Sequence, residues 1–418
     1  MGDSEAIEGD IMSLIRSLYK YVISHKIKFG LFLVVFVGWL FCLPKPLFND
    51  PNSTVVESKE GILIGARIAA DGQWRFPAAD SVPFRFEQAI LHFEDEYFYK
   101  HPGFNPVSIG KALWGNITTH KRRGGSTLTQ QVIRLSRKNK QRSYGEKVIE
   151  IMQATRLEAE YSKKEILGYY ASHAPFGGNV VGLETASWRY FGIPASELSW
   201  GQAAGLAVLP NAPALIFPGK NEVRIKEKRD RLLLKLFQKR IIDSTSYELA
   251  IAETLPGKPL PLPETALHLT ERIRKEYPGM RVETTVDIHL QKTLNSIVRE
   301  HHFQLQQNEI HNIAIVVLDI ETREILAYIG NAPTTSENNK FVDIIDSPRS
   351  TGSILKPFLY TALLDSGELL PNTLVADIPT VINGYSPENF DKQFNGAVPA
   401  SIAVRAAAMT RWTEPAST

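Results

Sequence analysis

The chain has 418 residues, of which 43% are hydrophobic and 22% charged, so it can bury the cores of two or three domains. Its 47 Lys and Arg residues nearly balance 45 Asp and Glu residues, and a formal net charge of +2 does not indicate a nucleic-acid-binding protein. The single cysteine, Cys42, excludes an intrachain disulfide and a metal site built from several cysteines.

The first predicted element is a transmembrane helix. Residues 29–43 read FGLFLVVFVGWLFCL and carry no charge. This run would form a helix ~22 Å long, whereas the hydrocarbon core of a bilayer is ~30 Å thick, so we extend the predicted anchor to residues 29–47. Several basic residues precede the run, namely Arg16, Lys20, Lys26 and Lys28. They predict a cytoplasmic tail at residues 1–28 and the rest of the chain outside. A cleavable signal peptide is the alternative, although no small-x-small cleavage site follows the run.

Helical patterns dominate residues 81–250, after a short strand-like alternation at residues 61–68. Two capping boxes predict helix starts, one from Ser162 with Glu165 and one from Ser199 with Gln202. We therefore expect a mainly helical first domain over residues 55–250.

A Pro-rich stretch, LPGKPLPLP, follows at residues 255–263 and predicts a linker region over residues 251–310. Beyond it, IAIVVLDI and ILAYIG flank a polar turn and predict a hairpin. The predicted fold class is thus multidomain, with an N-terminal transmembrane helix, a mainly-α domain, and an α/β domain over residues 311–418.

Three polar segments stand out in the helical region. Residues 94–103 crowd three acids among aromatic residues, a pattern that alone is typical of a solvated helix end. Residues 121–131 join three cations, two glycines and hydroxyl side chains before a helical pattern, which suits an oxyanion, although the ending of a Walker A loop is missing. In residues 142–150, Lys147 and Glu150 share one helix face, which alone indicates a surface ion pair.

Together these segments resemble glycosyltransferase family 51, the peptidoglycan polymerase module of class A penicillin-binding proteins. Its first three motifs are similar, in order, to EDEYFYKHPG, GGSTLTQQ and RSYGEKVIE. Its fourth motif is similar to SKKEILGYY, and its fifth is similar to APFGGNVVGLETASWRYFG together with AAGLAVLPNAP. The segments APFGG and ASWRYFG are most similar to the corresponding sequences of the penicillin-binding protein 1C branch. The resemblance implies a lysozyme-like fold and an enzyme that polymerises lipid II into β-linked glycan, with inversion at the anomeric carbon.

The resemblance also implies roles for single residues. Glu94 would take the proton of the attacking sugar hydroxyl, and Glu150 would position the region around the leaving pyrophosphate. The other predicted substrate-binding residues are Asp95, His101, Ser126, Thr127, Gln130, Gln131, Arg134 and Lys147. No cofactor is certain, and a divalent cation, Mg²⁺ or Mn²⁺, is the open alternative. For His101, a structural hydrogen bond that holds the first motif is the favoured interpretation.

Two positions depart from the family pattern. Glu146 stands where the family usually has an arginine, and the family sequence YLN reads Tyr170, Ala171, Ser172 here. Both glutamates of the expected site are retained, so we expect the chemistry to be intact. The departures slightly favour one alternative, a non-catalytic membrane-anchored scaffold for cell-wall synthesis. A lysozyme-like hydrolase is disfavoured, because a hydrolase has no pyrophosphate to bind.

A second candidate site begins at Ser353. Ser353 and Lys356 match SxxK within RSTGSILKPFLY, which resembles the nucleophile region of penicillin-binding transpeptidases. The pattern alone is weak evidence, because Ser17 and Lys20 match it as well. Neither SxN nor KTG follows Lys356, so residues 311–418 are interpreted as a truncated, inactive transpeptidase domain.

The expected partners are lipid II, undecaprenyl-pyrophosphate-linked glycan, membrane lipid and other cell-wall synthesis proteins, with no nucleic acid. The expected location is the bacterial inner membrane, with a single transmembrane pass and the catalytic domains on the periplasmic side.

Overall fold

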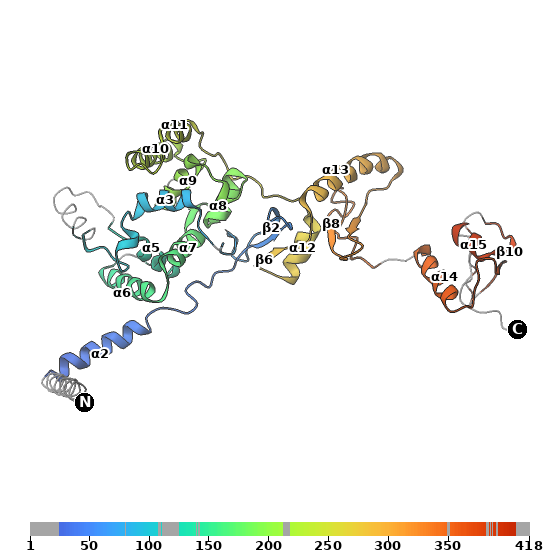
Figure 1. Cartoon of the computed structure of the whole chain (residues 1–418), viewed down its shortest axis with the longest axis horizontal. Coiled ribbons are helices and arrows are strands. Elements are labelled where there is room, and N and C mark those ends of the chain that lie inside the picture. Colours follow the sequence, from blue (N-terminus) through green and yellow to red (C-terminus); the bar gives the residue numbers. More distant parts are fainter. Residues whose placement is uncertain are drawn as a thin grey trace, which may run out of the picture. The chain divides into compact units, whose positions relative to one another are not determined.

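The computed structural model divides the chain into two compact units, residues 1–345 and 346–418, which are drawn in Figure 1 and described separately here. The residues that the structure describes are 25–79, 81–107, 110, 125–138, 140, 143–211, 218–348, 352–381, 384, 386, 388–389 and 392–406. Several segments named from the sequence lie outside them, namely most of the predicted cytoplasmic tail, the Ser17 motif, residues 121–124 and Arg142.

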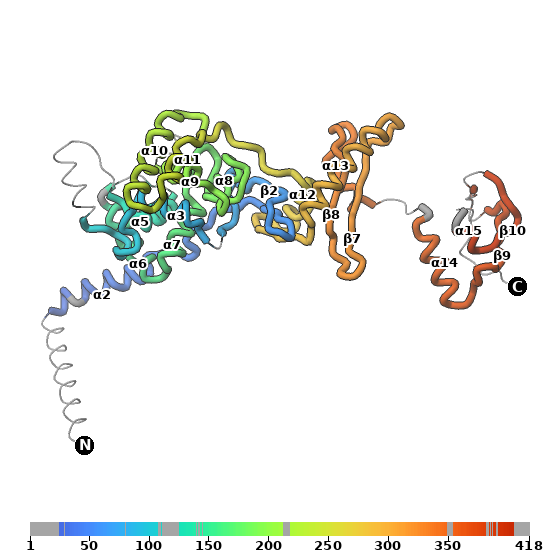
Figure 2. Tube along the Cα trace, turned by 45° about the horizontal axis from the view of Figure 1, so that its top comes forward, coloured from blue at the N-terminus to red at the C-terminus, as the bar shows by residue number. Residues whose placement is uncertain are grey.

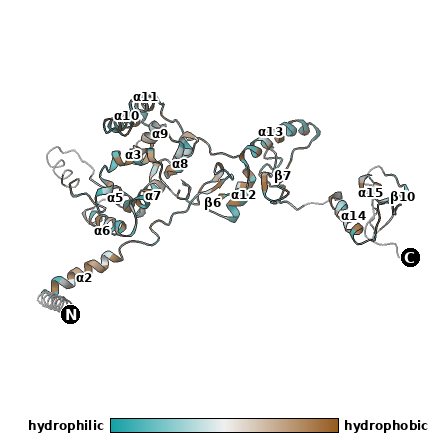
Figure 3. Cartoon of the chain, in the orientation of Figure 1, coloured by the Kyte–Doolittle hydropathy of each residue, from teal (hydrophilic) through white to brown (hydrophobic). Residues whose placement is uncertain are grey.

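The apolar run forms helix α2 (Lys26–Leu40), which is among the most hydrophobic elements in Figure 3. The helix ends at Leu40, so the extension of the predicted anchor to residue 47 is wrong. Pro44 and Pro46 disfavour helix there, and Leu43 and Leu47 are buried in the core of the helical domain instead. In the described part of the chain, no helix has both the length and the apolar character needed to cross a membrane.

The helical domain follows as predicted. Its helices are α3 (Phe84–Glu94), α5 (Leu128–Ser136), α6 (Tyr144–Glu160), α7 (Lys163–His173), α8 (Leu183–Phe191), α9 (Trp200–Ala207), α10 (Glu222–Gln238) and α11 (Ser244–Ala252), with short 3₁₀ turns η1 (Phe98–Lys100) and η2 (Ala195–Glu197). Both predicted capping boxes are confirmed, because Ser162 and Ser199 each accept a backbone N–H and receive the reciprocal bond. One apolar cluster, which includes Phe86, Ile133 and Leu206, joins most of these helices.

Two small sheets border the helices. In one, β1 (Thr54–Glu57) pairs antiparallel with β2 (Leu63–Arg67) and parallel with β6 (Arg281–Glu283). In the other, β5 (Val180–Val181) lies between β3 (Trp74–Arg75) and β4 (Pro175–Gly177). The pairing of β1 with β6 brings the start of the helical domain beside a segment more than 200 residues later in the chain.

The predicted linker region, 251–310, is more structured than a linker. Its longest stretch without helix or strand is residues 253–266, where Glu264 forms one isolated β-bridge. After them come α12 (Leu267–Glu276), β6, α13 (Ile288–Leu305) and the 3₁₀ turn η3 (Gln306–Asn308). These elements fold because Ile273 and Val286 bury apolar surface against Val56 and Ile64 of the β1–β2 hairpin.

The predicted hairpin is confirmed. Strands β7 (Ile315–Leu318) and β8 (Ile325–Ile329) pair antiparallel and run side by side in Figure 2. The hairpin lies in the first unit, because Ala327 and Ile329 pack against Leu294 and Val298 of α13. The second unit contains η4 (Gly352–Leu355), α14 (Lys356–Asp365), β9 (Leu374–Asp377), β10 (Gly396–Pro399) and α15 (Ala400–Ala406), and its two strands pair antiparallel.

Candidate active site

Glu94 is the last residue of α3, and its half-buried carboxylate is held by two amides. Buried Phe86 and Ile90 fix α3 in the core. Gln131 Nε2 donates to Glu94 Oε2 at 2.8 Å, and Asn211 Nδ2 donates to Glu94 Oε1 at 3.3 Å. Each carboxylate oxygen therefore keeps a further lone pair with which it can accept a proton.

Asp95 and His101 are buried and hold each other. His101 Nε2 lies 3.1 and 3.0 Å from the two carboxylate oxygens of Asp95. Asp95 Oδ2 also accepts the backbone N–H of Leu128 at 3.0 Å, where a carboxylate is favoured by the positive end of the α5 dipole. These contacts fix the turn after α3 against the start of α5, in agreement with the structural interpretation of His101.

Thr127 is buried, and its hydroxyl group is used twice within the fold. It accepts the backbone N–H of Gln130 at 3.2 Å, which caps α5, and it donates to the carbonyl of Gly103 at 2.6 Å. Gly103 has φ +89°, and a Cβ there would lie 2.7 Å from the carbonyl oxygen of Ala154. A glycine is therefore needed at the end of the first motif.

Two cations surround Glu150. Arg134 donates to both of its carboxylate oxygens, at 2.8 and 3.0 Å, and Lys147 Nζ lies 3.3 Å from one of them. Both cations also converge on the Ser126 hydroxyl, at 3.2 and 3.0 Å, and Lys147 donates to Gln130 Oε1 at 2.6 Å. We refer to Ser126, Gln130, Arg134, Lys147 and Glu150 as the Glu150 cluster.

The Glu150 cluster carries a net positive charge. Burial alone would raise the pKa of Glu150, but the hydrogen bonds and charges of Arg134 and Lys147 outweigh burial and lower it. Glu150 is therefore ionised at neutral pH and neutralises one of the two cations. The remaining positive charge, beside the hydroxyl of Ser126, suits a bound anion.

Sequence reasoning missed three residues around Glu94. Asn211, whose amide reaches Glu94, accepts a hydrogen bond from Lys228 Nζ at 3.1 Å. Tyr170 is buried next to Glu94. Burial, and to a smaller extent the negative charge of Glu94, raises the pKa of the Tyr170 hydroxyl well above its usual value. Among the described residues, no partner lies within hydrogen-bond distance of the Tyr170 hydroxyl. Asn211 and Tyr170 stand in the quoted motif segments, whereas Lys228 stands in a charge run without a distinctive pattern.

The departure at Glu146 has a local explanation. Arg137, directly after α5, donates to both carboxylate oxygens of Glu146, with the shortest contact at 2.7 Å. Glu146 lies in the first turn of α6, where a carboxylate is favoured by the helix dipole. The residue therefore links α5 to α6 beside the Glu150 cluster.

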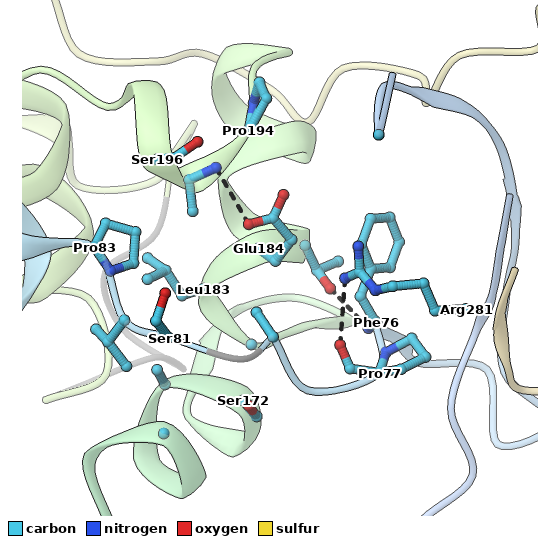
Figure 4. Close-up of a pocket in the computed structure, with 18 of the residues that line it drawn as sticks. Phe76, Pro77, Ser81, Pro83, Ser172, Leu183, Glu184, Pro194, Ser196 and Arg281 are labelled. Carbon is cyan, nitrogen blue, oxygen red and sulfur yellow. Dashed lines mark hydrogen bonds between the residues drawn. The ribbon is translucent and has the colours of Figure 1, made fainter. Parts of the chain in front are cut away.

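Ser172 lies elsewhere, in the wall of a separate cavity of about 390 Å³ (Figure 4). Figure 4 shows Glu184 of α8 near Arg281 of β6 in this cavity, and burial raises the pKa of Glu184. Pro83, which precedes α3, also lines the cavity, whereas Glu94 ends the same helix ~16 Å away. The departure at Ser172 thus falls in the wall of this cavity, two residues after Tyr170 on α7.

The residues present do not fit a divalent cation at Glu150. Both carboxylate oxygens already accept hydrogen bonds from fixed cations, and a metal ion would have to displace them. Within the residues that the structure describes, no three His, Cys, Asp or Glu side chains are grouped so that they could hold a metal ion.

The second candidate site lies in the second unit. Ser353 is in the 3₁₀ turn η4, and Lys356 is the first residue of α14. The side chain of Ser353 is outside the described residues. The backbone places the two positions one helical turn apart, as SxxK requires.

Comparisons with known proteins agree with this organisation. Residues 64–237 match the family model described as "Transglycosylase", and residues 313–418 match that described as "Penicillin binding protein transpeptidase domain". The chain is 33% identical to penicillin-binding protein 1C of Escherichia coli over 86% of this chain and 47% of that protein. It is 30% identical to penicillin-binding protein 1B of the same organism over 77% of this chain and 41% of that protein.

The chain spans about half the length of the curated relatives that it matches. Among solved structures, it resembles the crystal structure of penicillin-binding protein 1A from Haemophilus influenzae. That likeness has 17% identity and a TM-score of 0.36, and it covers 85% of this chain and 59% of the other.

Proposed function

Since the chain belongs to the class A penicillin-binding proteins, we propose that its helical domain is a peptidoglycan glycosyltransferase that polymerises lipid II into β-1,4-linked glycan. The proposal rests on one observation in particular: the two glutamates of the site have opposite kinds of partner. Neutral amides hold Glu94, whereas cations saturate Glu150. Two carboxylates in such different surroundings are suited to different tasks.

Glu94 is the general base in this proposal. The 4-hydroxyl of the acceptor sugar attacks the anomeric carbon of the lipid-linked glycan chain, and Glu94 takes the hydroxyl proton. The bond between the anomeric carbon and the pyrophosphate oxygen breaks, and its electron pair leaves with undecaprenyl pyrophosphate. One direct displacement converts the α-linked donor into a β-linked product, so no covalent sugar-enzyme intermediate is needed.

The Glu150 cluster binds the leaving pyrophosphate. Negative charge builds up on this group as the bond breaks. Glu150 already orients Arg134 and Lys147 before substrate arrives, and both cations donate to the Ser126 hydroxyl oxygen. These residues supply the positive charge themselves. We therefore propose that Glu150 positions the two cations and that the reaction does not require Mg²⁺ or Mn²⁺ at this carboxylate.

We further propose a single-pass anchor in the bacterial inner membrane, with α2 as part of it and both domains on the periplasmic side. In support, α2 carries no charged residue from Phe29 to its end at Leu40, and its side chains from Leu31 to Val37 are exposed. Trp39 Nε1 donates to Thr155 Oγ1 of α6 at 3.0 Å, and the Arg156 guanidinium lies over the Trp39 ring. These contacts would hold the helical domain next to the lipid that carries its substrate. Membrane lipid and other cell-wall synthesis proteins are the further proposed partners.

The proposal is tested by incubating the detergent-solubilised chain with labelled lipid II and separating glycan products on a gel. The wild-type chain is expected to form glycan, and Glu94→Gln is expected to form none, because the amide is nearly isosteric but cannot accept the proton. Glu87→Gln on the same helix is the matched control, since the Glu87 carboxylate accepts a hydrogen bond from the exposed Tyr99 hydroxyl at 2.7 Å. Equal turnover by wild type and Glu94→Gln would contradict the assignment.

A further inference from the structure

One face of α10 carries a row of three lysines, which we call the lysine row: Lys228, Lys235 and Lys239. They are seven and four residues apart, so they lie on one side of the helix and its last turn. The apolar side chains of α10, including Leu232 and Leu236, bury the helix against the core, and α10 contacts α3. The lysine row therefore faces the end of α3 at which Glu94 lies.

Lys235 and Lys239 contact the C-terminal end of α3 directly. Lys235 Nζ donates to the carbonyl of His92 at 2.7 Å, one of the last carbonyls of the helix, and lies 2.9 Å from Glu96. Lys239 Nζ lies 2.6 Å from the same carboxylate. Cations at this end are favoured by the negative pole of the helix dipole. The two lysines thus fix the residues on both sides of Glu94.

Lys228 reaches Glu94 itself through one amide. Its ammonium group donates to Asn211 Oδ1 at 3.1 Å, and Asn211 Nδ2 donates to Glu94 Oε1 at 3.3 Å. An ammonium group can only donate and a carboxylate can only accept, so this orientation of the Asn211 amide is the one that satisfies both neighbours. The amide therefore couples a cation on α10 to the carboxylate on α3.

In the part of the chain that the structure describes, few other charged groups act on this pair. Tyr170 on α7 faces Glu94, and Asp95 and Glu96 follow it in the chain. Around Lys228, burial lowers the pKa of the ammonium group, the charge of Glu94 opposes this effect, and Arg224 and Arg231 on the same helix add to the lowering. Lys228 is half-buried, and its ammonium group lies 6.0 Å from the centre of the Phe93 ring, so its charge is only partly screened by water.

We propose that Lys228 is a positioning residue for Glu94, and that it acts through Asn211 to fix the Oε1 atom and to favour the ionised carboxylate. The inference rests on the proposed function of the helical domain and deepens it. A general base must be ionised before it can take a proton, and its oxygen must lie within reach of the attacking hydroxyl. The relay meets both needs without touching the substrate.

Removal of the Lys228 charge should make Glu94 harder to ionise. The carboxylate then becomes competent as a base only at a higher pH, so the acidic limb of the pH profile of kcat/KM moves to higher pH. An opposite charge near a carboxyl group typically shifts its titration by one unit or more at contact distance, and an effect through one amide should be about one unit or less. The KM for lipid II should stay unchanged, because the Glu150 cluster is intact.

The experiment compares Lys228→Met, Lys228→Arg, Asn211→Leu and the double variant Lys228→Met with Asn211→Leu in the full chain. Initial rates of lipid II polymerisation are measured across the acidic pH range, beside melting curves of each variant. For Lys228→Met and for Asn211→Leu we expect about a tenfold fall in kcat and a shift of the acidic limb to higher pH. The double variant should show no larger effect than either single variant. Lys228→Arg should retain the wild-type limb, because it keeps the charge.

Lys226→Met is the matched control, since Lys226 is exposed on the same helix and pairs with Asp230 at 2.6 Å. It should behave like wild type. If Lys228→Met melts early, Asn211→Leu decides the question, because it breaks the relay without altering α10. An acidic limb in Lys228→Met and Asn211→Leu identical to that of Lys226→Met would overturn the inference. A wild-type chain that forms no glycan would instead contradict the proposed function.

Discussion

Gln131 and Arg134, one helical turn apart on α5, each hold one of the two glutamates of the site. Gln131 donates to Glu94 at 2.8 Å, and Arg134 donates to Glu150 at 2.8 and 3.0 Å. A single helix thereby sets the positions of both carboxylates. Asp95 and Thr127 in turn fix the start of that helix, so the first and second motifs are one structural unit.

The Glu150 cluster predicts how the site binds an anionic ligand. Arg134→Ala and Lys147→Ala should each weaken binding of lipid II, or of a moenomycin-type phosphoglycolipid, by roughly ten- to a hundredfold, because a hydrogen bond to a charged group contributes about 1.5 to 3 kcal/mol. Binding is measured by fluorescence anisotropy with a labelled phosphoglycolipid. Lys164→Ala, which removes an exposed cation of α7, is the control. If both variants bind like the control, the pyrophosphate site lies elsewhere.

Gln131→Glu should place a second carboxylate beside Glu94. Two carboxylates at this distance share a proton at neutral pH, so the base becomes protonated. We expect polymerisation to fall strongly at neutral pH and to recover in part as the pH rises. Gln131→Met, which removes the amide without adding charge, should lower the rate without this recovery. A flat pH response in Gln131→Glu would show that Gln131 does not face the reacting carboxylate.

The contact between Arg137 and Glu146 predicts a change of stability rather than of chemistry. Glu146→Arg restores the residue that the family usually has, but here it places two guanidinium groups together. The expected loss is about 1 kcal/mol in the free energy of unfolding, measured by denaturant titration. Arg137→Glu combined with Glu146→Arg should recover most of this loss. Polymerisation should continue in both variants, so complete loss of activity in Glu146→Arg would be evidence against this structural role.

Features that depend on near neighbours in the sequence could be predicted. Ser162 needs only Glu165 to form its capping box, and the hairpin needs only two apolar runs and a turn. The pairing of Lys147 with Glu150 follows from helical spacing in the same way. Such signals are local, and the structure confirms them.

Contacts between distant residues could not be predicted in this way. Asn211 reaches Glu94 across 117 positions, and no spacing rule relates the two. Lys228 belongs to a charge run that resembles a solvated helix face. Leu47 was placed in a membrane by its apolar character, but it is buried in the helical core, because hydrophobicity alone does not distinguish these two surroundings.

Acid should weaken the attachment of α10 to α3. The hydrogen bond from Lys239, and after it in size the hydrogen bond from Lys235, lowers the pKa of Glu96 from its usual 4.5 to about 2. The carboxylate therefore contributes its full stabilisation above pH 4.5 and loses it progressively as the pH falls towards 2. Glu96→Gln should lower the melting temperature at neutral pH and make it less dependent on pH in this window. Equal acid dependence of wild type and Glu96→Gln would show that the two ion pairs do not stabilise the fold.

A polypeptide of residues 1–418 alone should not become acylated by penicillin at Ser353. Acylation requires that Lys356 lies against the serine hydroxyl and that donors point at the developing oxyanion. The resemblance to transpeptidases assigns these tasks in part to SxN and KTG segments, and neither occurs between Lys356 and residue 418. Loss of one oxyanion donor alone typically costs ~2.7 to 4 kcal/mol, so labelling should be orders of magnitude slower than in a complete site. The test is a fluorescent penicillin followed on a gel, with Ser353→Ala as the control. Stoichiometric labelling that disappears in Ser353→Ala would contradict this expectation, because it would require a working nucleophile without those two segments.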